Sequence, residues 1–262
     1  MHYIKINYII NLGEILGNIN VQLNYYQEIW LKNIFEPYVS ENADKNISYP
    51  FFTGVSEKYL SAKKRIMIVG QETNGWSVYK PDWTIANSQK WVVDYLDYQL
   101  HYSNNPNLKL QFGKRNSSPF WSFFKPFSND EIVPCWNNID KAQRYINGKT
   151  KSLTVDIEME LNKNLPNTNK TLFQNEVEIT KPDIIVFITG PYYHTTMERA
   201  MNIEKGVLQS LNLSYETGCI DITSVSGFEI PTFWTYHPRH ISSRKNPLCR
   251  DDIIKIIKGR FD

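Results

Sequence analysis

Four short, continuous apolar runs constrain the fold of this chain more than any other feature. The strongest is PDIIVFITG at 182–190, a nearly unbroken β-branched run that ends in glycine. The other three are RIMIVG at 65–70, EIVPCWNNI at 131–139 and TFWTYHP at 232–238. Runs that do not alternate with polar residues are typical of strands buried on both faces of a parallel sheet. We therefore expect four central strands, while CIDITSV at 219–225 is either a further strand or an extended loop.

Helical patterns lie between and after these runs, at 87–102, 171–181 and 194–211, and RDDIIKIIKGRF at 250–261 closes the chain as an amphipathic helix. Strands that alternate with helices predict an open α/β sheet. Helix-like spacing of apolar residues also fills much of the region before the first run, which predicts a helical N-terminal extension at about 1–60.

Size and composition favour one folded domain. The chain has 262 residues, of which 41% are hydrophobic and 21% are charged, enough to build a full core. Polar stretches at 103–118 and 147–170 are expected to be loops, and neither resembles a linker between domains. We therefore expect a single α/β domain over 1–262.

The sequence gives no indication of a metal, a cofactor or a membrane. The three cysteines, Cys135, Cys219 and Cys249, lie far apart without a CxxC pair or a Cys/His cluster, so neither a disulfide framework nor a zinc or iron–sulfur site is expected. The apolar N-terminus is interrupted by Lys5 and Glu14 and lacks a small-residue cleavage site. The simplest expectation is a cytoplasmic monomer.

Charge is unevenly distributed although the formal net charge is only +2. The last segment, 237–262, contains seven Lys or Arg against three Asp, so it carries +4 and the remainder carries −2. A basic segment of this kind binds a polyanion or forms a solvated helix face, and composition alone does not decide between the two.

The residues that follow the apolar runs are the candidates for a site, because ligands of open α/β sheets bind beyond the carboxyl ends of the strands. They are Gly70-Gln71-Glu72, Asn137-Asn138, Gly190-Pro191-Tyr192 and His237-Pro238-Arg239. Each has an ordinary structural explanation: Glu72 and His237 as turn residues, Asn138 as a helix cap. Their occurrence at all four strand ends predicts one site that contains an acid, an amide and an imidazole.

Together these motifs resemble the uracil-DNA glycosylase superfamily. GQExxxW from Gly70 is similar to that family's Gly-Gln-Asp-Pro-Tyr-His, and HPRHIS from His237 to its His-Pro-Ser-Pro-Leu-Ser. WNNIDK resembles an Asn-x-x-Lys version of the middle motif. The resemblance covers roughly 60–245. It implies a three-layer α/β/α fold with a central four-stranded, mostly parallel sheet, and removal of uracil or a related damaged base from single- or double-stranded DNA.

The resemblance also implies roles in catalysis and base binding. Glu72 would take the position of the family's catalytic Asp and assist attack by water, while His237 would donate to the developing charge on the base oxygen. Asn138 would read the base edge, and the backbone at Gly70 and Gln71 would add contacts. An aromatic side chain from SPFW, either Phe120 or Trp121, would stack on the extruded base.

Contacts with DNA are implied at the last motif. Ile241 stands where the family carries its apolar wedge, and Ser242, Arg239 and Arg244 would hold flanking phosphates. Arg239 itself replaces a Ser of the family motif.

The chain departs from the family at the acid and at the methyl-excluding position. Glu72 is one methylene longer than Asp, and Asn74 replaces a Tyr that excludes the thymine methyl group. Two alternatives therefore stay open. One is a non-catalytic nucleic-acid or nucleobase binder on the same fold. The other is an unrelated α/β hydrolase that acts on a nucleoside or a phosphorylated small molecule.

Overall fold

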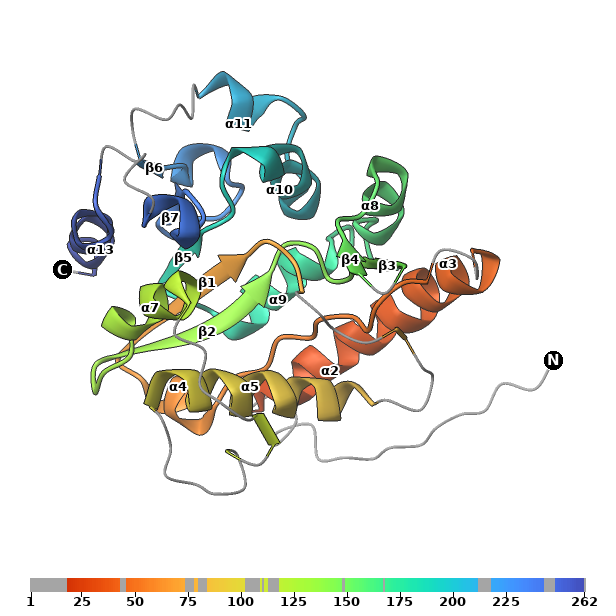
Figure 1. Ribbon diagram of the computed structural model, residues 1–262, viewed down its shortest axis with the longest axis horizontal. Coiled ribbons are helices and arrows are strands. Elements are labelled where there is room, and N and C mark those ends of the chain that lie inside the picture. The colour runs from red at the N-terminus through yellow and green to blue at the C-terminus, as the bar shows by residue number, and fades with distance from the viewer. Residues whose placement is uncertain are drawn as a thin grey trace.

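The computed structural model describes residues 18–42, 46–73, 78–79, 84–101, 109, 111–112, 118–147, 149–166, 168–211, 218–242 and 248–261. Within these ranges a five-stranded sheet has the order β2-β1-β5-β7-β6 (Figure 1). Its strands are β1 (Lys64–Gly70), β2 (Ile132–Asn138), β5 (Ile184–Phe187), β6 (Cys219–Asp221) and β7 (Thr232–Thr235).

The four predicted runs form the four parallel strands of this sheet. β1 pairs in parallel with β2 and β5, and β5 pairs in parallel with β7. The expectation of four strands was one too few, because 219–221 adds β6 to the edge of the sheet, antiparallel to β7. β1 shows why the runs lack polar residues: Ile66, Met67, Ile68 and Val69 are each 0% exposed, so both faces of the strand are covered.

Helices flank the sheet on both sides in an α/β arrangement (Figure 1). Before β1 lie α2 (Ile19–Trp30), the π-helical turn η1 (Leu31–Phe35), α3 (Glu36–Glu41) and α4 (Glu57–Ser61). Between β1 and β5 lie α5 (Ile85–His101), α7 (Pro119–Phe124), η3 (Lys125–Phe127), the hairpin β3 (Arg144–Ile146) and β4 (Lys149–Lys151), α8 (Val155–Leu161) and α9 (Leu172–Thr180). After β5 come η4 (Pro191–Tyr193), α10 (His194–Met201), α11 (Val207–Ser210), η5 (Thr223–Val225), α12 (Pro238–Ile241) and α13 (Arg250–Lys258).

Two of the predicted elements differ from the structure. The helix expected over 194–211 is divided into α10 and α11, because Asn202 and Gly206 adopt the left-handed conformation, with φ of 54° and 92°. The segment 147–170, expected to be a loop, contains β4 and α8. None of the described helices is long and apolar enough to cross a membrane.

The described part of the N-terminal region is an integral part of the core. Trp30 on α2 is fully buried, stacks on Phe35 at a ring-centroid distance of 5.2 Å, and donates its indole N–H to the carbonyl oxygen of Leu161 at 2.8 Å. α2 also packs against α9 (Figure 1). The region is therefore not an appendage to the sheet, and residues 1–17 lie outside the described ranges.

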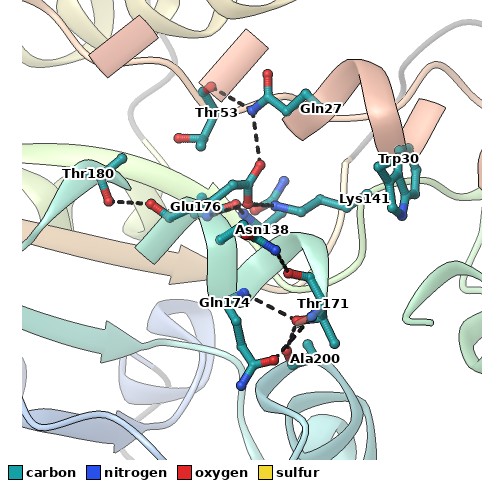
Figure 2. Close-up of polar contacts among 12 residues, drawn as sticks. Gln27, Trp30, Thr53, Asn138, Lys141, Thr171, Gln174, Glu176, Thr180 and Ala200 are labelled. Carbon is teal, nitrogen blue, oxygen red and sulfur yellow. Dashed lines mark hydrogen bonds and ion pairs between the residues drawn. The ribbon is translucent and has the colours of Figure 1, made fainter. Parts of the chain in front are cut away.

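A buried polar network joins the helices to the sheet beneath the carboxyl end of β2. The ammonium of Lys141 lies 2.6 Å from Oε2 of Glu176 on α9, and Figure 2 shows both groups pointing toward each other. Lys141 also donates to Oδ1 of Asn137 at 2.5 Å, and Gln27 on α2 donates to Oε1 of Glu176 at 3.0 Å. These residues are 0–6% exposed, so the charges are satisfied inside the protein rather than by water.

We expect Lys141→Met to destabilise the fold strongly. The substitution leaves the Glu176 carboxylate buried without its cation, a change that typically costs about 3–5 kcal/mol in the free energy of unfolding. Urea unfolding followed by tryptophan fluorescence measures it. Lys32→Met is the matched control, because the ion pair between Lys32 and Glu28 is exposed and such pairs contribute about 0–1 kcal/mol. Equal losses in the two variants would contradict the assignment.

Candidate functional site at the carboxyl end of the sheet

The order of the strands defines where a ligand would bind. From β1 the chain passes to β2 on one side and then returns to β5 on the other, so the direction of winding reverses at β1. A reversal of this kind opens a crevice beyond the carboxyl ends of the two diverging strands. The residues at this point are Gly70, Gln71 and Glu72 after β1, with Thr189 and Gly190 after β5.

Gln71 connects the two strands at this point. Its side-chain amide donates to the carbonyl oxygen of Thr189 at 2.6 Å, and its own carbonyl accepts from the backbone N–H of Asp140 at 2.9 Å. The sequence predicted that the backbone of Gln71 contacts a base. In the structure the carbonyl of that backbone is already bonded to Asp140, in the segment after β2.

Four predicted residues lie together on one side of the strand ends. A Cβ atom added to Gly70 would stand 2.6 Å from Oδ1 of Asn138 and 3.1 Å from the ring of Phe120, so only glycine allows this close approach. The rings of Phe120 and His237 are 6.1 Å apart between centroids and within 25° of parallel. Asn138 is 1% exposed, so the amide is covered by its neighbours. Trp121, the other aromatic candidate, is 4% exposed and packs in the core.

His237 is held in a defined tautomer. Its Nδ1 accepts a hydrogen bond from the backbone N–H of Arg239 at 3.3 Å, at the start of α12. Burial lowers the pKa of the imidazole, and the positive charge of Arg239 lowers it further. The neutral ring therefore carries its proton on Nε2, which makes that atom a hydrogen-bond donor.

Glu72 lies at the same end of the sheet, after β1. Its Oε1 accepts from the hydroxyl of Ser152 at 3.3 Å, and Oε2 is buried with no hydrogen-bond partner among the described residues. Burial raises the pKa of this carboxyl group, and the dipoles of Ser152, Tyr193 and Gln143 lower it in part. Burial also raises the pKa of Tyr193, and the charge of Glu72 adds to this effect, which shows that the two side chains are neighbours.

The acid and the imidazole are linked through the segment after β5. Tyr193 beside Glu72 donates its backbone N–H to the carbonyl of Gly190 at 3.4 Å, and the N–H of Gly190 donates to Thr235 at 3.2 Å. A Cβ atom on Gly190 would stand 3.7 Å from the backbone nitrogen of His237. The structure thus brings the ends of all four parallel strands to one edge of the sheet.

Asp140 was missed in the sequence and is the least expected group at this edge. It is 1% exposed, and neither carboxylate oxygen has a hydrogen-bond partner within the described ranges. Burial raises the pKa of Asp140 well above its usual range, and the charges of Glu158 and Glu72 add to this effect. The signal in the sequence was its position, since Asp140 lies two residues beyond the end of β2, at the carboxyl edge where ligands of such sheets bind.

A partly buried ion pair borders the acidic groups. Glu158 on α8 accepts from the hydroxyl of Thr196 at 3.0 Å and pairs with the guanidinium of Arg199, both on α10. The pKa of Glu158 is raised by burial, with Thr196 and Arg199 acting in the opposite direction. Arg199 therefore supplies positive charge near Asp140, while one of its N–H groups is already bonded to Glu158.

The residues predicted to contact DNA fall in different environments. Arg239 is exposed, and the exposed Ser242 donates its hydroxyl to the carbonyl of Pro238 at 2.9 Å. Ile241 is only 6% exposed and packs in the core, so it does not project as an apolar wedge and that expectation is not met. Arg244, predicted to hold a phosphate, lies outside the described residues, as does Asn74.

The basic C-terminal segment is partly neutralised. Arg250 pairs with Asp251 at 2.9 Å, and Arg260 pairs with Asp221 on β6 at 2.7 Å. Both pairs are exposed to solvent, so they leave some positive charge available at the surface. Only the pair with Asp221 brings a negative charge from outside the segment, since Asp251 belongs to the segment itself.

No protein-family model matches the chain, and no curated protein matches it.

We expect Asp140→Asn to stabilise the protein at neutral pH by about 1–2 kcal/mol, because it removes a buried carboxylate that has no hydrogen-bond partner within the described ranges. Because the pKa of Asp140 is raised in the folded state, its contribution to stability is present below the unfolded-state pKa and is lost as the pH rises. The gain from the substitution should therefore be larger at pH 7 than at about pH 4.

Urea unfolding at both pH values measures this difference. Asp130→Asn, at an exposed position of the same chain, is the control and should leave stability unchanged at either pH. A loss of stability at pH 7 in Asp140→Asn would show that the carboxylate has a stabilising partner.

Proposed function

We propose that the protein is a DNA glycosylase that hydrolyses the N-glycosidic bond of uracil or a related damaged base. The observation that carries the proposal is that Phe120 lies beside both the Asn138 amide and the His237 imidazole, while Glu72 follows β1 at the same edge of the sheet. The motif resemblance of Gly70-Gln71-Glu72 and His237-Pro238-Arg239 supports the same assignment. No cofactor is invoked.

In the proposed reaction the bond between C1′ of the sugar and the base nitrogen breaks, and its electron pair leaves with the base. The Nε2 proton of His237 donates a hydrogen bond to the base oxygen that gains negative charge. Because the imidazole is neutral, it stabilises the anion without having to transfer its proton. This agrees with the lowered pKa of His237 and with the tautomer fixed by Arg239.

Glu72 acts on the sugar side of the same bond. Its carboxylate favours the positive charge that develops on the sugar, and it accepts a proton from the water that attacks C1′. The oxygen of that water forms the new bond to C1′. The departing base anion then takes up a proton from solvent and Glu72 releases its own, so the products are an abasic site and the free base. The unpartnered Oε2 of Glu72 is the atom suited to accept the proton.

Extrusion of the nucleotide is required because C1′ and the base are shielded in the stack. Phe120 lies against Gly70 and Asn138 and nearly parallel to His237, which suits it to stack on the extruded base. Arg239 is the exposed cation nearest to His237 in the sequence and is suited to hold a flanking phosphate.

The second candidate function is a nucleobase or nucleic-acid binder that uses the same groups. An assay for excision of the base separates this binder from an enzyme.

We expect an oligonucleotide with one uracil to be converted to an abasic site, which alkali then cleaves. Glu72→Gln and His237→Ala should each lower the single-turnover rate about 100- to 1000-fold, because each removes a group that acts mainly in the transition state. Glu57→Gln, at an exposed position of α4, should leave the rate unchanged. Binding without any cleavage of uracil, hypoxanthine or oxidised pyrimidines would favour the binder.

The rate should rise with pH across the pKa of Glu72, since the reaction uses the ionised carboxylate. Burial raises this pKa, so the acidic limb of the single-turnover profile should lie above the value of an ordinary Glu, about 4.3. The lowered pKa of His237 extends the pH range in which its ring is neutral toward the acid side. In Glu72→Gln the residual rate should no longer rise with pH in this range. If the rise persists in that variant, the titrating group is not Glu72.

A further inference from the structure

We propose that Trp136 is a specificity-determining positioning residue: its indole N–H fixes the Asn138 amide so that the site presents a donor and selects bases with a carbonyl oxygen over bases with an amino group. This inference rests on the proposed function and names the class of base that the site accepts. Trp136 lies on β2, two residues before Asn138, so the two side chains share one face of the strand.

Trp136 is held firmly by its aromatic neighbours. It is 6% exposed, and its ring makes edge contacts with Phe51 and Trp121 at centroid distances of 4.8 and 5.0 Å. Phe120 lies 5.9 Å away on the side of the strand ends. Because these rings surround the indole, the direction of its N–H bond is set by packing rather than by Asn138.

The indole then determines which end of the amide faces it. Nε1 of Trp136 lies 3.0 Å from Oδ1 of Asn138. An indole N–H only donates, so a rotated amide would oppose its own NH₂ group to that donor and leave both without a partner. Gly70 leaves room for this end of the amide, since a Cβ atom there would stand 2.6 Å from Oδ1.

With Oδ1 occupied, the amide offers Nδ2 to a ligand. Nδ2 is buried and has no hydrogen-bond partner among the described residues. A buried donor without a partner is unfavourable, so the group that fills this place should be an acceptor. Since Asn138 is 1% exposed, a base reaches Nδ2 only after the side chains that cover it move apart.

Two donors thus characterise the base side of the site, Nδ2 of Asn138 and Nε2 of His237. A base with carbonyl oxygens, such as uracil or hypoxanthine, matches them. The amino group of cytosine or adenine would place a donor against Nδ2 and leave both groups unpaired. The inference therefore assigns the site to oxo bases, including the deaminated forms of cytosine and adenine.

Trp136→Phe tests the inference because it removes the indole N–H and keeps an aromatic ring. The amide of Asn138 is then free to turn, so the preference for uracil over cytosine, measured as the ratio of excision rates, should fall about 10-fold or more. Free uracil and free cytosine, used as competing ligands in NMR titrations, give the same ratio without catalysis. Trp30→Phe is the matched control, because it removes another buried indole bond, from Trp30 to Leu161, and should leave the ratio unchanged.

Gly70→Ala provides a second route to the same result if Trp136→Phe fails to fold. Its Cβ atom would displace Oδ1 of Asn138 while Trp136 stays intact, so the ratio should fall in this variant too. If the wild-type protein excises uracil and neither variant changes the ratio, the inference is wrong and the proposed function stands. If it neither excises uracil nor binds free uracil in preference to cytosine, both are wrong. Binding of free uracil over cytosine without excision, with a lower ratio in Trp136→Phe, supports the inference and contradicts only the enzyme.

Discussion

The buried pair of Lys141 and Glu176 is the interaction on which the carboxyl end of the sheet depends. Its members come from the segment after β2 and from α9, and Asn137 and Gln27 bind the same charges from β2 and α2. A pair at this depth is seldom favourable against an apolar replacement, so its value lies in geometry rather than in stability. It fixes the course of the chain from Asn137 to Lys141, the segment that carries Asn138 and Asp140.

The buried polar side chains at this end of the sheet differ in whether they have hydrogen-bond partners. Asn137, Lys141 and Glu176 are fully bonded to one another, whereas Asp140 and one oxygen of Glu72 have no partner within the described part of the chain. Most buried polar groups in proteins are paired, and those that are not tend to mark sites of function. The contrast separates the polar groups that hold this part of the fold together from those left unpaired, although Asp140 precedes Lys141 directly in the sequence.

The sequence predicted the parallel strands well because their signal is local. Each run is apolar throughout, and burial on both faces leaves that pattern in any parallel strand. The break between α10 and α11 has a weaker signal in the sequence. Only Asn202 and Gly206, which adopt the left-handed conformation, interrupt a pattern that otherwise predicts one helix over 194–211. β6 was ambiguous because an edge strand of Cys219–Asp221 is too short to show a period.

At the site, the sequence identified residue types but not their surroundings. The glycine, amide and histidine that follow the strands do lie together, because strand ends of a parallel sheet share one edge. Ile241 could not be judged from its spacing, since α12 turns this side chain into the core. The indole that binds Asn138 is also invisible to motif reasoning, because Trp136 reads as an ordinary strand residue.

The bond from Gln71 to Thr189 has a consequence for access. Where parallel strands diverge at a reversal of winding, no ladder of main-chain hydrogen bonds continues between them, and the gap is free to widen. Here the side chain of Gln71 adds a hydrogen bond beyond the last main-chain pair of β1 and β5, so the strands cannot separate at this end without breaking that bond. A ligand that binds at this edge therefore meets two strands whose spacing is fixed by a side chain as well as by the main chain, so it gains no room by pushing β1 and β5 apart.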